Sequence, residues 1–411
     1  MQVIHERCAG LDVHKKSVSA CVLRWEAGGK KVRELRVFGT MTRDLLQLAD
    51  WLKAQEVTHV AMEATEVYWR PIWSVLEGQF SLLLVNPQHI KVVPGRKTDT
   101  KDCEWIADLL QHGLLQGSFV PPTPIQDLRD LTRYRAELTQ AQNRVANRIQ
   151  KLLEQANIKL ASVASNALGV SGRQILEALV QGEQDPERLA QRAQRRLRSK
   201  IPELRLALEG KVRDHHRFLL REYLDEWEAI GQRIARVEEE VERQLGPFEW
   251  AVTLCQTMPG VEWVTAANLV AEIGVNMEQF PTASHLASWA GLCPGNHESA
   301  GKRISGKMRE GNRWLRRTLC QAAWAVSRKD CYLSSQFRRL ASRRGIKRAV
   351  MAVAHTMLII TYHMLKNTRS YTELGGTYLE QINKDQLQRY FVKKLHKLGL
   401  KVTVEPLTQP A

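Results

Sequence analysis

The sequence predicts an α/β domain at the N-terminus followed by a longer, mainly helical remainder. Strand-like and helix-like patterns alternate over about the first 120 residues, as in a domain with helices packed on a sheet. Apolar residues at three-, four- and seven-residue steps then indicate long helices, and a compact helical region starts near residue 250. A chain of 411 residues can build two to three domains.

The N-terminal patterns define individual elements. Four apolar residues share one side of the first expected helix, and short apolar runs are suited to buried strands. A proline-rich segment at residues 121–124 closes the domain as a rigid linker. The expected elements are two strands joined by a Lys-Lys-Ser turn within residues 9–23, a helix over 42–53 with Leu45, Leu48, Ala49 and Leu52 on one side, strands over 59–62 and 81–85, and a helix over 100–115.

Two long apolar stripes dominate the middle of the chain. They run over residues 128–156 and 219–245 and would both be buried if two helices paired as an antiparallel coiled coil. A simple helical bundle fits the same periodicity, and the polar, arginine-rich segment 160–211 would cap the far end. The expected domains are an α/β domain over 1–124, a coiled-coil or helical spacer over 125–250, a helical domain over 251–380 and a basic tail over 381–411.

The charge indicates a polyanionic partner. Sixty Lys and Arg against 44 Asp and Glu give a net charge of +16, and nucleic acid is the first candidate. Seven scattered cysteines without a C-x-x-C pair favour reduced thiols in a cytosolic protein. No apolar core of a signal peptide follows the N-terminus, and polar residues interrupt the apolar stretch 349–365, which predicts a buried core helix and no membrane partner.

Four acids of the first domain are candidates for holding divalent metal ions. Asp12 lies inside the first strand, where a charge is costly without a cation, and Glu63 follows a strand at its carboxyl end. Asp99 and Asp102 are three residues apart at a helix start and therefore share one face. Two metal ions acting on a phosphodiester need such converging carboxylates.

Each acid also has a structural interpretation. Asp99 can be a helix N-cap, Asp102 a first-turn acid favoured by the helix dipole, and Glu63 a surface residue. Together, a strand Asp, a strand-end Glu and a helical D-x-x-D resemble the ribonuclease H-like nuclease arrangement. Three further acids are competitors for these metal-binding roles. Glu66 is the best substitute, whereas Glu104 and Asp108 are expected to face solvent.

A basic segment follows a glycine-rich turn in the last third of the chain. Between residues 302 and 348 fifteen Lys and Arg are opposed only by Glu310 and Asp330, which favours a phosphate-binding face over a solvated charge run. Ser299, flanked by Ala300 and Gly301, could approach a phosphate without steric obstruction, although a turn serine is the simpler interpretation and Ser305 is a rival. The nearest candidate phosphate ligands are Lys302, Arg303, Lys307, Arg309, Arg313, Arg316 and Arg317.

Several blocks together resemble the IS110-family transposases, also called DEDD recombinases. The resemblance runs through GLDVHKKSV, VAMEATEVYW, LLVNPQHIKVV and KTDTKDCEWIADLL, and resumes with MPGVEWVTAANLVAEIG and LASWAGLCPGNHESAGKRISGKMREGNRWLRRTL. It implies that Asp12, Glu63, Asp99 and Asp102 are the metal-binding acids of a RuvC-like (ribonuclease H-like) domain, using Mg²⁺ or Mn²⁺. It also implies that Ser299 becomes covalently joined to DNA. The family often has two adjacent serines where this chain has Glu298 and Ser299.

The same resemblance implies partners. Family members use a structured noncoding bridge RNA that pairs with both target and donor double-stranded DNA. They form homo-oligomers, here expected to be dimers that assemble into a tetramer, in which the acidic domain of one subunit joins the serine domain of another. The expected location is the cytoplasm of a bacterium or archaeon, at the nucleoid.

Two other functions remain open from the residues alone. A RuvC-like junction nuclease that uses only water would need the acids and not Ser299. A non-enzymatic nucleic-acid-binding protein would use the acids structurally and would bind DNA without magnesium.

Overall fold

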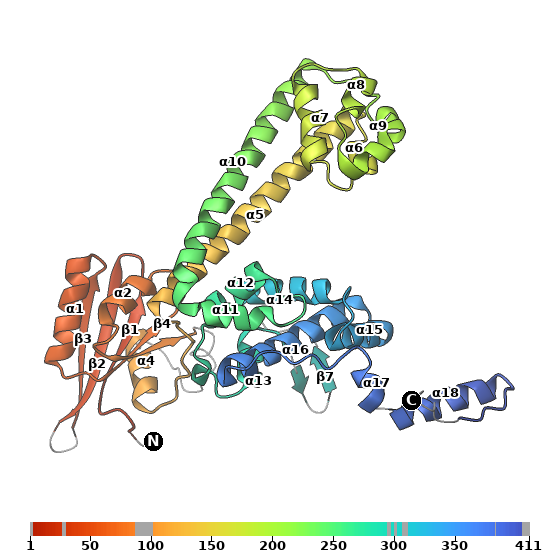
Figure 1. The fold of residues 1–411 in the computed structure, drawn as a ribbon. Coiled ribbons are helices and arrows are strands. Elements are labelled where there is room, and N and C mark those ends of the chain that lie inside the picture. The colour runs from red at the N-terminus through yellow and green to blue at the C-terminus, as the bar shows by residue number, and fades with distance from the viewer. Residues whose placement is uncertain are drawn as a thin grey trace. The chain divides into compact units, whose positions relative to one another are not determined.

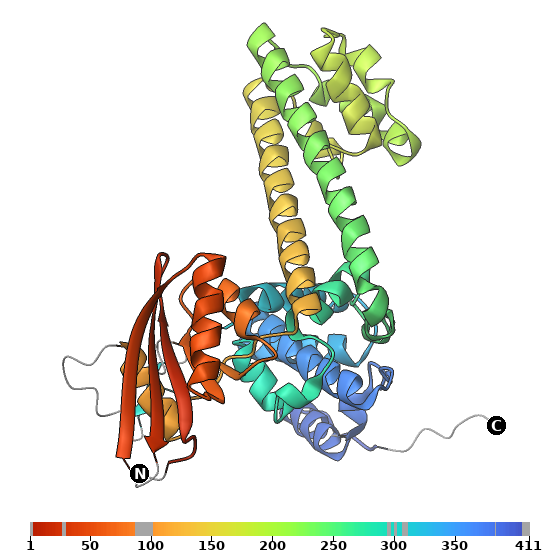
Figure 2. The ribbon, with the colours of Figure 1, turned by 90° about the vertical axis from the view of Figure 1, so that its left-hand side faces the viewer.

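The computed structural model describes residues 3–26, 30–86, 102–293, 297–299, 302–305, 311–382 and 384–404 (Figure 1). The chain forms two compact units, Met1–Val120 and Pro121–Ala411. The first contains the larger sheet, and the second contains long and short helices with a small hairpin (Figures 1 and 2).

A mixed sheet of five strands forms the first unit. Its strand order is β3-β2-β1-β4-β5, with antiparallel pairing through β3, β2 and β1 and parallel pairing from β1 to β4 and β5. The parallel half matters for the site because it places the carboxyl ends of β1 and β4 at the same edge. The strands are β1 (Arg7–Val13), β2 (Ser17–Glu26), β3 (Lys30–Gly39), β4 (His59–Glu63) and β5 (Ser81–Val85).

Helices cover both faces of this sheet. Alternate residues of β1 divide between two cores, as the period of two in a strand requires. Leu11 and Val13 pack with α1 (Thr42–Ala54) and α2 (Trp69–Leu76), whereas Cys8 packs with α4 (Asp102–Gln111) on the opposite face.

Most predicted elements of this unit are confirmed. The strand pair within 9–23, the helix over 42–53 with its four buried residues and the strands over 59–62 and 81–85 are present. The helix predicted to end at residue 115 ends at Gln111, because Gly113 takes a left-handed φ of 66° and turns the chain. The edge strand β3 was not expected, since its exposed Val37 and its many charges hide the strand pattern.

Two long antiparallel helices begin the second unit, and we call them the arm. They are α5 (Thr123–Gln155) and α10 (Asp214–Leu245). Arg135 of α5 pairs with Glu238 of α10, and further along α5 Arg148 pairs with the earlier Glu226, which fixes the antiparallel direction. The predicted long helices and their pairing are therefore confirmed, while the supercoiling of a coiled coil stays a prediction. Pro124, expected in a linker, lies in the first turn of α5, where a missing N–H costs nothing.

Short helices fill the segment between the two arm helices, and we call residues 156–213 the tip. Its apolar residues continue the core of the arm, with Ile175, Leu179 and Leu204 buried beside Leu152 and Leu220. The tip helices are α6 (Leu160–Val163), α7 (Val170–Val180), α8 (Pro186–Ala190), η1 (Arg195–Lys200) and α9 (Ile201–Ala207).

The rest of the second unit is mainly helical, as predicted. The turn at Met258–Val261 leads into a helix, with Gly260 at a φ of 84°. The elements are η2 (Gly246–Phe248), α11 (Glu249–Gln256), α12 (Trp263–Ile273), η3 (Met277–Gln279), α13 (Ala283–Trp289), β6 (His297–Ser299), β7 (Lys302–Ser305), α14 (Arg313–Val326), α15 (Tyr332–Arg344), α16 (Ile346–Asn367), α17 (Tyr378–Ile382) and α18 (Lys384–Lys397).

Helix α16 is long and apolar enough to cross a membrane by length and composition alone. In this structure 56% of its most apolar 18-residue stretch is buried, and Val353, Met357 and Tyr362 are among its fully or almost fully buried residues. The helix contacts α13, α14 and α15. The helix therefore serves as the core of this region.

Candidate active site

Asp12 and Glu63 end neighbouring parallel strands. The register of β1 and β4 places Leu11 beside Met62, so the next residues, Asp12 and Glu63, are neighbours at the carboxyl edge of the sheet. Adjacent strands are about 4.8 Å apart. Both carboxylates follow the side-chain row of Cys8 and Ala61, which faces α4. Two of the four predicted acids therefore converge on one face.

Gly10 allows α4 to lie directly on β1. A Cβ at this position would lie 2.3 Å from the carbonyl oxygen of Cys103 and 2.4 Å from the amide nitrogen of Ala107. Both are backbone atoms of α4, so no side chain could move aside to make room. This close approach brings the first turn of α4 beside the end of β1, where Asp12 lies two residues after Gly10.

The electrostatics of Cys103 place Asp12 near this first turn. Burial, and after it the negative charge of Asp12, raise the pKa of the Cys103 thiol to about 11. Asp102, the first residue of α4, precedes Cys103 and is exposed. Three of the four predicted acids thus belong to elements that meet at one edge, while Asp99 lies outside the described residues.

Asp12 is suited by its surroundings to bind a cation. Its side chain is 17% exposed, and its only ion pair with a described residue is to His14, whose Nε2 lies 3.2 Å from Oδ2. His14 is itself exposed and carries a full charge only when protonated. Among the described residues no three His, Cys, Asp or Glu side chains gather closely enough to hold a metal ion. The described acids of the site contribute carboxylate oxygens, which are the donor type that Mg²⁺ prefers.

Two competing acids are occupied by cations from β3. Glu104 pairs with Arg33, and the Lys31 ammonium lies 2.7 Å from an Asp108 carboxylate oxygen. The expectation that Glu104 faces solvent is wrong, since its side chain is only 12% exposed. Glu66 is exposed in the loop after β4, at a left-handed φ of 45°. None of the three sits at a strand end beside Asp12.

Ser299 ends the first strand of a small hairpin. Strand β6 pairs antiparallel with β7, which places Ser299 opposite Lys302 and His297 opposite Ser305. The hairpin lies in the chain between α13 and α14, where Gly311 packs against the backbone of Gly291. A Cβ at Gly311 would lie 2.4 Å from the Gly291 nitrogen, so the two ends of the hairpin segment are held together.

Three of the predicted phosphate ligands lie on α14 and two on β7. Arg313 and Arg317 are exposed and Arg316 is half-buried, while Lys302 and Arg303 belong to the hairpin. Lys307 and Arg309 lie outside the described residues. The opposite side of this helix is apolar, with Leu315, Leu319, Ala322 and Ala323 buried and Trp314 half-buried.

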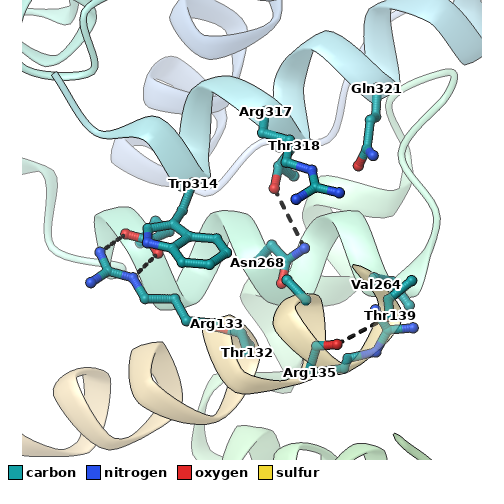
Figure 3. Close-up of a pocket in the computed structure, with 12 residues that line it drawn as sticks. Thr132, Arg133, Arg135, Thr139, Val264, Asn268, Trp314, Arg317, Thr318 and Gln321 are labelled. Carbon is teal, nitrogen blue, oxygen red and sulfur yellow. Dashed lines mark hydrogen bonds and ion pairs between the residues drawn. The ribbon is translucent and has the colours of Figure 1, made fainter. Parts of the chain in front are cut away.

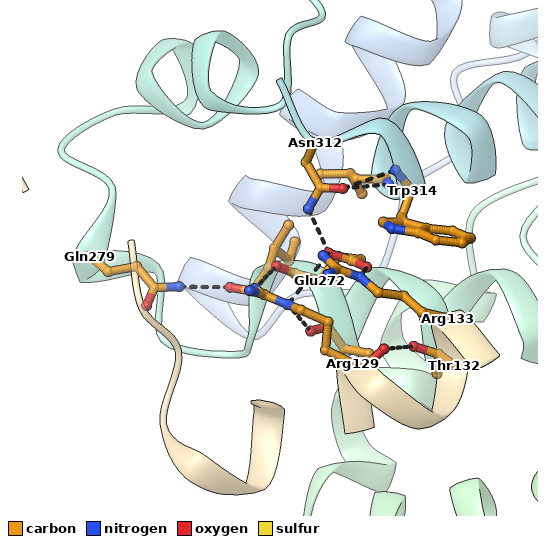
Figure 4. Close-up of polar contacts among 10 residues, drawn as sticks. Arg129, Thr132, Arg133, Glu272, Gln279, Asn312 and Trp314 are labelled. Carbon is orange, nitrogen blue, oxygen red and sulfur yellow. Dashed lines mark hydrogen bonds and ion pairs between the residues drawn. The ribbon is translucent and has the colours of Figure 1, made fainter. Parts of the chain in front are cut away.

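A buried carboxylate ties the start of α14 to the arm. Glu272 of α12 is 2% exposed and accepts two hydrogen bonds from the Arg133 guanidinium, at 2.7 and 2.8 Å (Figure 4). Asn312 also donates to Glu272, at 2.5 Å, while its own side-chain oxygen caps the first turn of α14. Arg129 is the second cation of the network, with its Nε 3.4 Å from a Glu272 carboxylate oxygen. The network therefore fixes the helix that follows the serine hairpin against α5.

A polar pocket opens beside this network, between α5, α12 and α14 (Figure 3). Arg133 and Arg135 line it, but both are neutralised, by Glu272 and Glu238 respectively. Arg317 reaches it from α14, and Asn268 donates to Thr318 across it at 3.5 Å. Sequence patterns did not indicate this pocket, although Glu272 stands out as a lone acid in an apolar helix.

Two family models match this chain. A family model described as a transposase matches residues 9–158, and a second, described as a transposase of the IS116/IS110/IS902 family, matches residues 252–339. The chain belongs to the IS110 family of transposases. The first match contains the acids and α4, and the second contains the serine hairpin and α14.

Curated relatives agree with this family. The chain is 25% identical to a "Probable family 20 transposase" of Pseudomonas aeruginosa, over 79% of this chain and 89% of the relative. It is 27% identical to an insertion element IS110 protein of Streptomyces coelicolor, over 68% of this chain and 73% of the relative. A pilin gene-inverting protein of Moraxella lacunata is 28% identical over 30% of this chain and 39% of the relative. As a member of the IS110 family, the chain is a DNA transposase or recombinase.

Proposed function

We propose that this IS110-family protein cuts and rejoins DNA through a covalent link to Ser299, assisted by Mg²⁺ or Mn²⁺ held by Asp12, Glu63, Asp99 and Asp102. The observation that carries the proposal is the pairing of β1 with β4. It sets two carboxylates side by side at the carboxyl edge of a sheet, next to the helix that begins with Asp102.

The acids would hold the metal ions as oxygen ligands. Bound there, a divalent ion would neutralise charge on the scissile phosphate and favour the ionised form of an attacking hydroxyl. Gly10 and the packing of α4 keep the donors close, and the partial burial of Asp12 strengthens its attraction for a cation.

Ser299 would act as the nucleophile. Its Oγ forms a bond to phosphorus while the bond from phosphorus to the leaving sugar oxygen breaks, and the serine proton passes to solvent or to that oxygen. In the second step a sugar hydroxyl of the new partner strand gives up its proton and bonds to phosphorus, while the bond from phosphorus to the Ser299 oxygen breaks and that oxygen takes up a proton. The bond count is conserved, so rejoining needs no external energy source.

The basic residues near the serine would bind the DNA backbone. Lys302 is opposite Ser299 in the hairpin, and Arg303 is the next residue of β7. Arg313, Arg316 and Arg317 follow on α14, and Lys307 and Arg309 belong to the same proposed set. Such cations position a strand and stabilise charge that develops at phosphorus.

A structured bridge RNA and a multimer complete the proposal. Pairing by an RNA would choose the donor and target sites, and dimers forming a tetramer would join the acids of one subunit to Ser299 of another. The net charge of +16 supports nucleic acid as a partner, because the cations neutralise backbone phosphates.

One experiment separates this proposal from its rivals. The purified protein is incubated with element DNA, bridge RNA and Mg²⁺, then denatured and examined for a protein–DNA adduct. We expect an adduct with the natural chain and none with Ser299→Ala, whereas recombinant junctions formed by Ser299→Ala would refute the covalent step. Cleavage without any adduct would favour a water-using junction nuclease.

The acids are tested by Asp12→Asn. We expect this chain to fold and bind DNA, yet to form no adduct at any Mg²⁺ concentration. Binding without cleavage by the natural chain, unaffected by Mg²⁺, would favour a non-enzymatic binding protein.

A further inference from the structure

The tip of the arm carries a basic segment that the proposed reaction does not use. Five cations occur within nine residues and no acid interrupts them. All five are exposed. We call this set the tip cations, and its members are Arg192, Arg195, Arg196, Arg198 and Lys200.

The segment is held in place by the fold. The Gln194 amide donates to the Ser171 hydroxyl at 2.9 Å, and the Gln194 side chain donates to Gln174 at 2.9 Å. Ala193 is buried, and Leu197 packs against the core of the tip. The cations are therefore displayed by an ordered surface, in contrast to a solvated charge run.

Several acids of the tip pair with cations outside this set. Glu177 lies 3.8 Å from Arg173, and Asp185 lies 3.5 Å from Arg188. Arg205 lies 3.4 Å from Glu187. By contrast, the tip cations make no ion pair with any described residue. Their mutual repulsion is left uncompensated within the described part of the chain, which is the pattern of a surface that meets an external polyanion.

Three of the tip cations line an open groove. Arg195, Arg196 and Lys200 form one side, and the turn that enters α7 forms the other. That turn contributes the polar side chains of Asn166 and Ser171. The first turn of α7 has no side-chain cap, so its amide groups add to the positive potential. Guanidinium, ammonium and hydroxyl donors in an open groove suit a sugar–phosphate backbone better than an apolar ligand.

We propose that the tip groove binds the backbone of a nucleic acid, as a second contact remote from the serine hairpin. This inference rests on the proposed function, because it assigns the arm to the DNA or RNA that the recombinase handles. Residues 159–251, which include most of the tip, lie outside both matched family models. An arm helix of 33 residues is about 50 Å long, close to one and a half turns of duplex DNA.

The test removes three cations from the groove and compares the chain with a matched control. The variant is R195Q/R196Q/K200Q. The control, R221Q/R233Q/R236Q, removes three exposed arginines from α10 and changes the net charge equally. Both are made in the Ser299→Ala background, so that binding is measured without strand cleavage. Circular dichroism melts confirm that both fold.

Binding is measured with a fluorescent 30-base-pair DNA duplex and, separately, with a folded RNA hairpin, over a series of salt concentrations. We expect the tip variant to bind at least one probe about 10-fold more weakly at physiological salt. The slope of log K against log salt should fall by about two to three, near one for each lost phosphate contact. The probe affected identifies the source as DNA, RNA or both.

Equal weakening by the tip variant and the control, or no weakening by either, would overturn the inference. Adduct formation by Ser299 is scored in a separate assay in the chain that retains the serine. The binding result for the tip can therefore be interpreted even if Ser299 forms no adduct.

Discussion

Replacing Gly10 by Ala should damage the proposed metal site without touching any of its acids. The new Cβ would lie 2.3 Å from one backbone atom of α4 and 2.4 Å from another, whereas ordinary contacts need about 3.5 Å. The helix and the sheet would therefore have to separate by about 1 Å. Overpacking of this kind costs about 1–3 kcal/mol of folding stability. A displacement of about 1 Å at a reacting centre can reduce the rate about 100-fold.

Two measurements test this reasoning. The first is the rate of adduct formation at saturating Mg²⁺, which should fall about 100-fold in Gly10→Ala. The second is the rise in melting temperature on adding Mn²⁺, which should shrink because a looser site binds the ion more weakly. Asp12 and Asp102 remain chemically intact, so both losses would report their spacing.

Gly246→Ala is the matched control. A Cβ there meets nothing within 4 Å, and the residue has helical backbone angles, so the change should be neutral or slightly stabilising. Wild-type rates and an unchanged metal response in Gly10→Ala would show that α4 does not set the geometry of the acids.

Three further predictions concern the second unit. Glu272→Ala removes the buried carboxylate that pairs with Arg129 and Arg133 and leaves their charges uncompensated. The free energy of unfolding, measured in urea, should fall by about 3 kcal/mol. An unchanged urea midpoint would contradict a structural role for this network. Gly260→Ala should cost more than about 1 kcal/mol in the same assay, because its φ is 84° and a carbonyl of α14 lies 3.0 Å from the added Cβ. Burial raises the pKa of Cys255 to about 12, so the unfolded thiol ionises first as pH rises, and stability should fall between about pH 9 and 12 by up to about 1.4 kcal/mol per pH unit. Cys255→Ala should make that fall shallower, and an identical pH profile would count against a protonated buried thiol.

The amino-acid sequence determined those features that depend on neighbours along the chain. Short apolar runs define β4 and β5, and Glu63 follows β4 directly, so its place at a strand end could be read from the pattern. The long stripes likewise predicted α5 and α10, because a helix must bury one continuous face. The resemblance to the IS110 family also predicted the roles of the four acids and of Ser299.

Only the tertiary structure decided which of these elements meet. Arg133 and Glu272 are 139 residues apart, and no local periodicity couples their charges. In the sequence nothing distinguishes Gly10 from other glycines. Only the structure shows that the backbone of α4 lies so close to Gly10 that a Cβ would not fit. Steric fit and ion pairing depend on distances through space, and those distances are set only when the whole chain has packed.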